Sequence, residues 1–246
     1  MVEKESGQSS QAYYKLPTGY VLALEHDTPF PSLSDALIEP NGLIAIGGDL
    51  STQRLLSAYQ QGIFPWSNYN PQDKDEPLMW WSPNPRMVLF PNELKISNSL
   101  KKTLKKHTFE TRINTAFEAV ITDCGKTPRN AQIEDENKTW ISPQMIAAYY
   151  NLHAHGFAMS AETWQDDELV GGCYGVKIGR MFYGESMFHH VTDASKVAFV
   201  HLVETLIKLD VGMIDCQMKT PLLTSFGGRE INREEFTQIL SKLVNF

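Results

Sequence analysis

Cysteine is scarce in this sequence, and long hydrophobic runs are missing. Cys124, Cys173 and Cys216 stand far apart with no CxxC pair, which excludes a disulfide framework and a zinc site of paired thiolates. No apolar stretch approaches the roughly 18 residues of a membrane-spanning helix, and the polar first ten residues do not resemble a secretion signal. We therefore expect a protein of the reducing cytoplasm that is neither secreted nor membrane-spanning.

Basic residues are outnumbered in the chain, except in one segment. There are 22 Lys and Arg against 29 Asp and Glu, but residues 86–113 hold seven basic and only two acidic residues. Within this segment Ser97 or Ser99 can cap a short helix that places Leu100 and Leu104 on one side. The other side carries Lys101, Lys102, Lys105 and Lys106. This face is either simply solvated or binds a phosphate backbone, and the acidity of the rest of the chain favours the second reading, in which the four ammonium groups attract phosphates whatever the base sequence.

The length of 246 residues and the ordinary hydrophobic content of 42% indicate a folded chain of one large domain or two unequal lobes. Two nearby prolines, Pro83 and Pro85, predict a junction between an N-terminal lobe of residues 1–84 and a larger lobe of residues 85–246. The leader up to about Tyr20 shows no clear periodicity, so we expect it to be mobile or loosely attached. Short helices are predicted over 31–37 and 51–61, the second capped by Ser51.

The larger lobe alternates helical and strand patterns. A helix is predicted from its cap Ser142 to Gly156, and further helices over 194–209 and from Asn232 onward. Runs rich in β-formers predict an antiparallel meander and one more strand, over 157–164, 168–178, 180–188 and 213–218. The expected fold class is α+β, with helices packed on a mostly antiparallel sheet.

Polar side chains interrupt two of these strands. Alternation predicts that Asp215 and Gln217 share one face of their strand, with Cys216 opposite. The pair could serve chemistry or could merely satisfy backbone groups at a strand end. Glu185 lies in an apolar strand, on the predicted face of Tyr183 and Met187, where an unpaired charge would be costly. We therefore expect it to have a cationic or hydrogen-bond-donating partner.

Five separated blocks, in the right order, resemble the leucyl/phenylalanyl-tRNA–protein transferase family: 39–50, 58–66, 80–86, 184–188 and 214–217. The resemblance implies a small N-terminal α/β lobe followed by a lobe similar to GNAT acetyltransferases. It also implies a monomeric bacterial enzyme of the cytoplasm that moves Leu, Phe or, less readily, Met from tRNA to a protein whose N-terminal residue is Lys or Arg, in the N-end rule pathway. No cofactor is implied, since the aminoacyl ester is already activated.

The resemblance also implies roles for particular residues. Asp215 and Gln217 correspond to the family's catalytic pair, and Glu185 to an acid in its active cleft. A substrate-binding set corresponds to positions around the terminal adenosine and the carried amino acid: Trp66, Trp140, Phe182, Cys173 and Ile214. The basic face at Lys101 to Lys106 is the predicted tRNA-binding surface.

This sequence departs from the family pattern at two positions and leaves two other protein classes open. Leu222 stands where the family often has His, and Cys173 where a Met is often found. A coenzyme A acyltransferase would need a better pyrophosphate-binding turn than residues 177–181 offer. A non-catalytic RNA-binding module would leave the three polar strand residues without a purpose. No histidine has a trustworthy ligand spacing, so we expect no metal.

Overall fold

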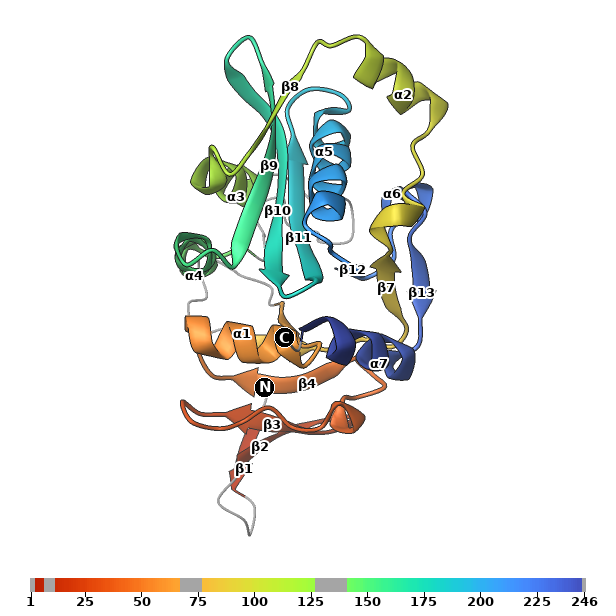
Figure 1. Cartoon of the computed structure of the whole chain (residues 1–246). Coiled ribbons are helices and arrows are strands. Elements are labelled where there is room, and N and C mark those ends of the chain that lie inside the picture. Colours follow the sequence, from red (N-terminus) through yellow and green to blue (C-terminus); the bar gives the residue numbers. More distant parts are fainter. Residues whose placement is uncertain (1–2, 7–11, 67–76, 127–140, 245–246) are drawn as a thin grey trace.

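The computed structural model describes residues 3–6, 12–66, 77–126 and 141–244, and it consists of two sheets flanked by helices (Figure 1). Almost all neighbouring strands are antiparallel; the parallel pairs are β3 (Gly19–Leu24) with β4 (Leu43–Gly47) and β11 (Met181–His189) with β12 (Met213–Gln217). The predicted fold class is confirmed. The predicted three-stranded antiparallel meander is confirmed as β9 (Ala158–Gln165), β10 (Glu168–Ile178) and β11. The further predicted strand is β12, which the chain enters after helix α5 (Ala194–Lys208) and which pairs parallel with β11.

The first sheet has six strands in the order β1-β2-β3-β4-β6-β5. Their bounds are Glu3–Ser6, Ala12–Leu16, Gly19–Leu24, Leu43–Gly47, Met79–Trp81 and Phe64–Pro65, in that order. The prediction of a loosely attached leader is therefore wrong for residues 12–20, which pair within this sheet. The four residues Val21 to Leu24 are all buried, and a strand covered on both faces does not show the alternation that identifies strands in a sequence.

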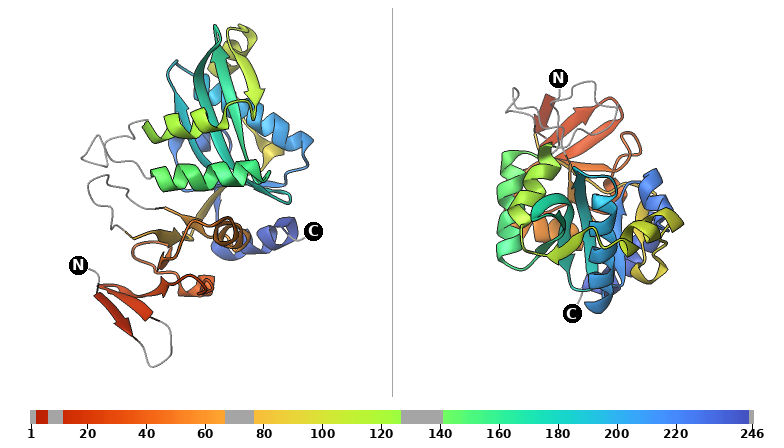
Figure 2. Two further views of the ribbon diagram at one scale, coloured as in Figure 1. Left: turned by 90° about the vertical axis from the view of Figure 1, so that its left-hand side faces the viewer. Right: turned by 90° about the horizontal axis from the view of Figure 1, so that it is seen from above.

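The second sheet has seven strands in the order β13-β7-β12-β11-β10-β9-β8. Their bounds are Arg229–Ile231, Arg86–Leu89, Met213–Gln217, Met181–His189, Glu168–Ile178, Ala158–Gln165 and Glu110–Ile113. Figure 2 shows α3 and α4 side by side on one face of this sheet, and α5 covers the other face. Each face has its own apolar cluster, so the central strands β10, β11 and β12 are buried on both sides.

The α-helices are α1 Thr52–Gln60, α2 Asn98–Lys105, α3 Phe117–Lys126, α4 Pro143–Ala154, α5 Ala194–Lys208, α6 Pro221–Ser225 and α7 Arg233–Val244. Three predicted caps are confirmed, because the hydroxyl groups of Ser51, Ser97 and Ser142 each accept a hydrogen bond from a backbone N–H of the first turn. The short helix predicted over 31–37 is reduced to a 3-10 turn at Leu33–Asp35.

The two sheets share a single apolar cluster. The chain passes from the first sheet to the second between Trp81 and Arg86, and the C-terminal helix α7 returns to lie beside α1 (Figure 1). Phe236 of α7 packs in the same cluster as Tyr59 of α1 and Trp80 of β6. The lobe boundary at residue 84 stays a prediction, but the packing shows that the C-terminal helix completes the core of the first lobe.

Candidate active site

A cavity of about 760 Å³ opens where β5, β11, β12 and α6 meet. Its walls are mainly apolar and come from segments that are far apart in the sequence. The predicted substrate-binding residues Trp66, Cys173, Phe182 and Ile214 all line it, as do Glu185, Gln217 and Leu222. Trp140, the remaining predicted substrate-binding residue, lies outside the described residues. The structure thus brings most of the predicted site into one space.

Two β-bulges shape the polar end of this cavity. On β11, Ser186 pairs with Tyr174 and Gly184 with the next residue, Gly175, so Glu185 is the extra residue. On β12, the register against β7 also shifts by one residue, at Cys216. A bulge re-aims the side chains around it. Gln217, which follows the second bulge, has a left-handed backbone with φ of 63°.

The bulge at Glu185 overturns one prediction made from strict alternation. Met187 was expected on the face of Glu185, but it packs in the apolar cluster of Phe182 on the other face. Cys216 packs with Ile214 in this same cluster, opposite the Asp215 side chain as alternation predicts, and it borders the cavity together with Gln217. Burial raises the pKa of the Cys216 thiol, which therefore stays protonated and is a weak nucleophile.

Glu185 is held by three hydrogen-bond donors. The hydroxyl of Tyr59 donates to Oε1 at 2.7 Å, that of Tyr149 to Oε2 at 3.2 Å, and Nε2 of Gln217 donates to Oε1 at 3.2 Å. The two tyrosine hydroxyls also contact each other at 2.5 Å. The expectation that Glu185 has a donating partner is confirmed, and the donors come from α1, α4 and β12.

The surroundings of Glu185 favour its protonated form. Burial raises the pKa of Glu185 from 4.5 to about 7, and the hydrogen bonds from Tyr59 and Tyr149 oppose this rise. Burial, together with the nearby Glu185, raises the pKa of both tyrosines, so each keeps its proton and acts as a donor. Glu185 can therefore exchange a proton near neutral pH, where a catalytic or binding group is useful.

The raised pKa predicts how stability depends on pH. Between about pH 4.5 and pH 7 the folded protein holds a proton that the unfolded chain has released, so stability falls as the pH rises through this window. The loss amounts to roughly 2–3 kcal/mol. We expect Glu185→Gln, which cannot ionise, to gain stability relative to the unchanged protein by about this amount between pH 5 and pH 8, measured by urea unfolding. An exposed control, Glu168→Gln, should keep the original pH dependence; the same dependence in Glu185→Gln would contradict the assignment.

Asp215 does not point into the cavity, and the prediction that it shares one space with Gln217 is wrong. The residue is 0% exposed, and its side chain forms a bidentate ion pair with Arg86 of β7, at 2.8 and 2.6 Å. The Arg86 guanidinium lies between the rings of Phe64 and Phe236, 4.7 and 4.8 Å from their centroids. Oδ1 of Asp215 also accepts the backbone N–H of Gln217 at 2.9 Å. Asp215 thus reaches the cavity only through the backbone of Gln217.

The four lysines, three in α2 and Lys106 at its C-cap, are exposed, and Leu100 is buried on the opposite side of the helix, as predicted. None of the four forms an ion pair with a carboxylate in the described part of the chain. Two other members of the basic segment do not contribute free charge: Arg86 is buried against Asp215, and Arg112 pairs with Glu110 and lies over the ring of Trp164. The exposed basic surface is therefore formed by α2 and its C-cap, with the exposed Lys95 shortly before the helix.

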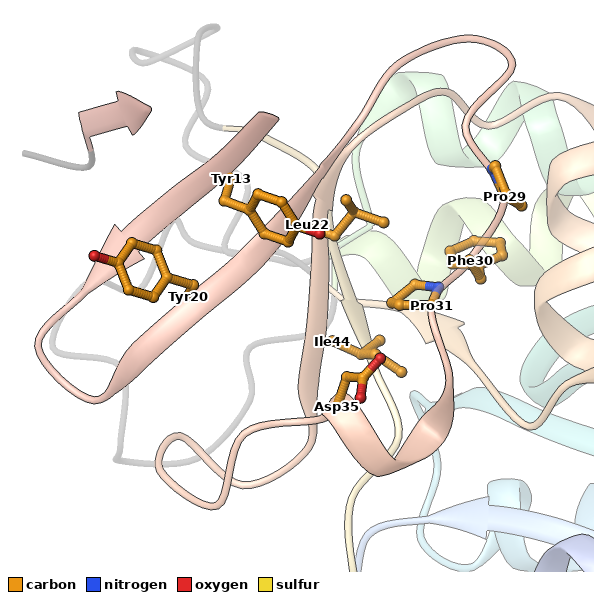
Figure 3. A pocket seen from close by; sticks show the side chains of 8 residues that line it. All are labelled: Tyr13, Tyr20, Leu22, Pro29, Phe30, Pro31, Asp35 and Ile44. Atoms are coloured by element: carbon orange, nitrogen blue, oxygen red, sulfur yellow. The ribbon is translucent and has the colours of Figure 1, made fainter. Parts of the chain in front are cut away.

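A second cavity, of about 350 Å³, lies in the first lobe (Figure 3). It is lined by three aromatic, two proline and two aliphatic side chains together with Asp35, and by none of the predicted site residues. Within residues 3–6, 12–66, 77–126 and 141–244, no group of three or more His, Cys, Asp or Glu side chains is arranged to hold a metal ion. In the same ranges, no helix is long and apolar enough to cross a membrane.

Three residues of the site were not identified as functional from the sequence: Tyr59, Tyr149 and Arg86. Both tyrosines fall on the apolar stripes of helices, where a ring is expected as core. The available signal was the phenolic hydroxyl, which needs a partner when it is buried. Arg86 was counted as part of the basic segment. The available signal was that it directly precedes the apolar residues of a buried strand, where a cation needs a buried acid as its partner.

Comparison with known proteins shows which family this chain belongs to. Residues 88–241 match the family described as leucyl/phenylalanyl-tRNA protein transferase, and residues 48–84 match the N-terminal domain of that family. The leucyl/phenylalanyl-tRNA–protein transferase of Nitrosomonas eutropha is 57% identical, with 92% of each chain covered. That of Nitrosospira multiformis is 56% identical, with 91% of this chain and 92% of the other covered.

Solved structures resemble this chain much less closely. L-PGS from Bacillus licheniformis aligns with 7% identity and a TM-score of 0.44, over 100% of this chain and 90% of that chain. A GCN5-related N-acetyltransferase from Kribbella flavida aligns with 7% identity and a TM-score of 0.38, over 93% and 86%. Similarities of this size carry no information about function. The matches in sequence do: the chain belongs to the leucyl/phenylalanyl-tRNA–protein transferase family and is an aminoacyltransferase that acts between aminoacyl-tRNA and proteins.

Proposed function

We propose that this enzyme moves Leu, Phe or, less readily, Met from tRNA to acceptor proteins that begin with Lys or Arg, and so marks them for degradation in a bacterial N-end rule pathway. It acts as a monomer in the cytoplasm. The observation that carries the proposal is the cavity, which is apolar along Phe182, Ile214 and Leu222 and polar where Glu185 meets Gln217. An apolar wall suits an aliphatic or aromatic side chain, and the polar end suits its reacting ester and amine.

The reaction needs an uncharged amine next to an activated ester. The acceptor's nitrogen bonds to the ester carbonyl carbon, the bond from that carbon to the ribose oxygen breaks, and one proton passes from the amine to the ribose oxygen. Gln217 can orient the amine through the oxygen of its side-chain amide. Its side-chain N–H can donate a hydrogen bond to the negative charge that develops on the carbonyl oxygen of the ester. Asp215 is a positioning residue in this scheme, since its ion pair with Arg86 and its bond to the Gln217 N–H fix the bulge.

Glu185 holds the cationic part of a substrate. The acceptor brings a basic side chain and an α-amine, and the aminoacyl group brings a second amine, so a carboxylate that titrates near pH 7 can bind either one. Tyr59 and Tyr149 fix its orientation from outside the cavity. This division assigns binding to Glu185 and the chemical step to Gln217.

The tRNA end and body have separate contact surfaces in this proposal. Trp66 borders the cavity and offers an indole face on which the unpaired terminal adenine can stack. Trp140, outside the described residues, stays a predicted second contact. The lysines of α2 meet phosphates of the tRNA, whatever their sequence.

The lysine contacts predict a change in salt dependence. Replacing Lys101 and Lys105 together by Ala should weaken tRNA binding and flatten the slope of log affinity against log salt by about one unit for each lost phosphate contact. Turnover at saturating tRNA should change little. Binding measured by filter retention over a salt series checks this, with Lys208→Ala/Lys242→Ala as a control of equal charge. Equal slopes in both double variants would contradict the phosphate contacts and indicate that the lysines of α2 are simply solvated.

The proposed activity is tested by incubating the protein with Phe-tRNA and a peptide that begins with Arg, with nothing else added. We expect the peptide to gain the mass of one phenylalanine residue. The same peptide with an acetylated N-terminus should gain none. A mass gain that requires an added acyl-coenzyme A, or no gain at all, would contradict the proposed function.

A further inference from the structure

Gly184 occupies an unusual position, in the middle of a buried strand and on the wall of the cavity. It lies on β11 directly before Glu185 and is one of the residues that line the cavity. Glycine weakens a strand because it adds backbone entropy to the unfolded chain and offers no side chain to pack. A glycine at this place therefore needs a reason in packing, in backbone conformation or in function.

Neighbouring glycines of the sheet have a packing reason. A Cβ added at Gly175 would lie 2.2 Å from the carbonyl oxygen of Tyr183, and one at Gly171 would lie 2.6 Å from Cβ of Ala194. Contacts this short cannot be relieved by a small movement of a flexible side chain. These positions accept only glycine because another part of the protein fills the space.

Gly184 has neither a packing reason nor a backbone reason. Among the described residues, the one atom within 4 Å of an added Cβ is the carbonyl oxygen of Asp215, at 3.7 Å, which is an ordinary contact. Its backbone is not in the left-handed region that favours glycine. An alanine would fit the protein at this position, and the space that its methyl group would take belongs to the cavity.

The direction of that space follows from the strand. Phe182 and Gly184 lie two residues apart before the bulge and face the same side, while the side chain of Tyr183 points to the opposite side and donates to the backbone oxygen of Tyr59. Phe182 and Ile214 are paired neighbours on β11 and β12 and form the apolar wall. Gly184 is thus located between the apolar wall and the Glu185–Gln217 end.

We propose that Gly184 is a specificity-determining residue, because the side chain that it lacks leaves the room that the larger transferred amino acids need. This proposal rests on the proposed function and deepens it. A single added carbon in a fitted pocket changes discrimination by roughly 10–200-fold. Gly184→Ala should therefore lower kcat/KM for transfer of Phe at least tenfold more than for transfer of Leu, which needs less room beside the wall.

The test compares transfer from Phe-tRNA and from Leu-tRNA by the unchanged protein, Gly184→Ala and Gly184→Val, with melting temperatures for each. The control is Gly125→Ala on α3, where an added Cβ would make an ordinary contact of 3.6 Å with Ile141. We expect Gly184→Ala to melt no lower than the unchanged protein and to lose Phe transfer selectively, Gly184→Val to lose both activities, and the control to lose neither.

Three results would overturn the proposal while leaving the proposed function intact. They are unchanged transfer by Gly184→Ala, equal loss for Phe and Leu, and a Gly184→Ala protein that no longer folds, since the last would show that the fold itself requires glycine. Absence of transfer by the unchanged protein would instead contradict the proposed function and this proposal with it.

Discussion

Replacing Arg86 by Ala is expected to lower the free energy of unfolding by about 3–5 kcal/mol, the cost of leaving a buried charge without its partner. Arg86 is 1% exposed, and both oxygens of Asp215 depend on it. Removal of the guanidinium also leaves a gap between the rings of Phe64 and Phe236. Asp215→Ala should cost a similar amount, because the Arg86 cation would then be unpaired. Urea unfolding at pH 7 measures both.

An exposed ion pair provides the matched comparison. Arg180 and Asp210 approach within 2.8 Å, but their side chains are 39% and 80% exposed. Arg180→Ala should therefore cost less than about 1 kcal/mol. If Arg86→Ala costs no more than this, the buried pair does not stabilise the fold as described. The comparison also matters for activity, because a loss of transfer in Asp215→Ala has to be separated from a loss of folded protein.

Gln217→Ala is expected to lower turnover by about 10²–10³-fold, the range seen when one donor to a developing oxyanion is removed. Gln217 is the uncharged polar side chain at the meeting point of Glu185 and the cavity, and its left-handed backbone is held by the Asp215 oxygen. The concentration of peptide that gives half-maximal rate should change little. Steady-state transfer to a peptide beginning with Arg measures both quantities.

Two variants separate the side chain from the backbone. Gln217→Gly should lose as much turnover as Gln217→Ala. Its free energy of unfolding should be about 1 kcal/mol higher than that of Gln217→Ala, because glycine adopts a φ of 63° without strain. Gln61→Ala, at the end of α1, removes an amide that bonds only within its own helix turn and should leave turnover unchanged. Near-normal turnover in Gln217→Ala would remove this residue from the chemical step.

Local patterns predicted the elements well where a single interaction determines them. The capping hydroxyls of Ser51, Ser97 and Ser142 and the apolar periodicity after each define helix starts that tertiary packing does not alter. Strand β3 was missed because both of its faces are buried, and alternation disappears in such a strand. The gathering of Trp66, Phe182 and Ile214 came from the resemblance and not from any spacing.

The arrangement within the site could not be read from the sequence, because two bulges change the direction of side chains. A bulge depends on how one strand pairs with the next, as with Glu185 against β10 and Cys216 against β7, and no local pattern records that pairing. Tyr59 meets Glu185 from 126 positions away. The sequence could show that Glu185 needs a donor, but not which residue supplies it.

The central claim is that Glu185 binds substrate while Gln217 serves the chemical step, at one end of one cavity. The most direct measurement is single-turnover transfer of Phe from tRNA to a peptide beginning with Arg, by Glu185→Gln over a range of peptide concentrations. We expect Glu185→Gln to need a higher peptide concentration for half-saturation, with a saturated rate reduced far less than in Gln217→Ala. Loss of the saturated rate in Glu185→Gln, with unchanged peptide binding, would contradict it and place Glu185 in the chemical step.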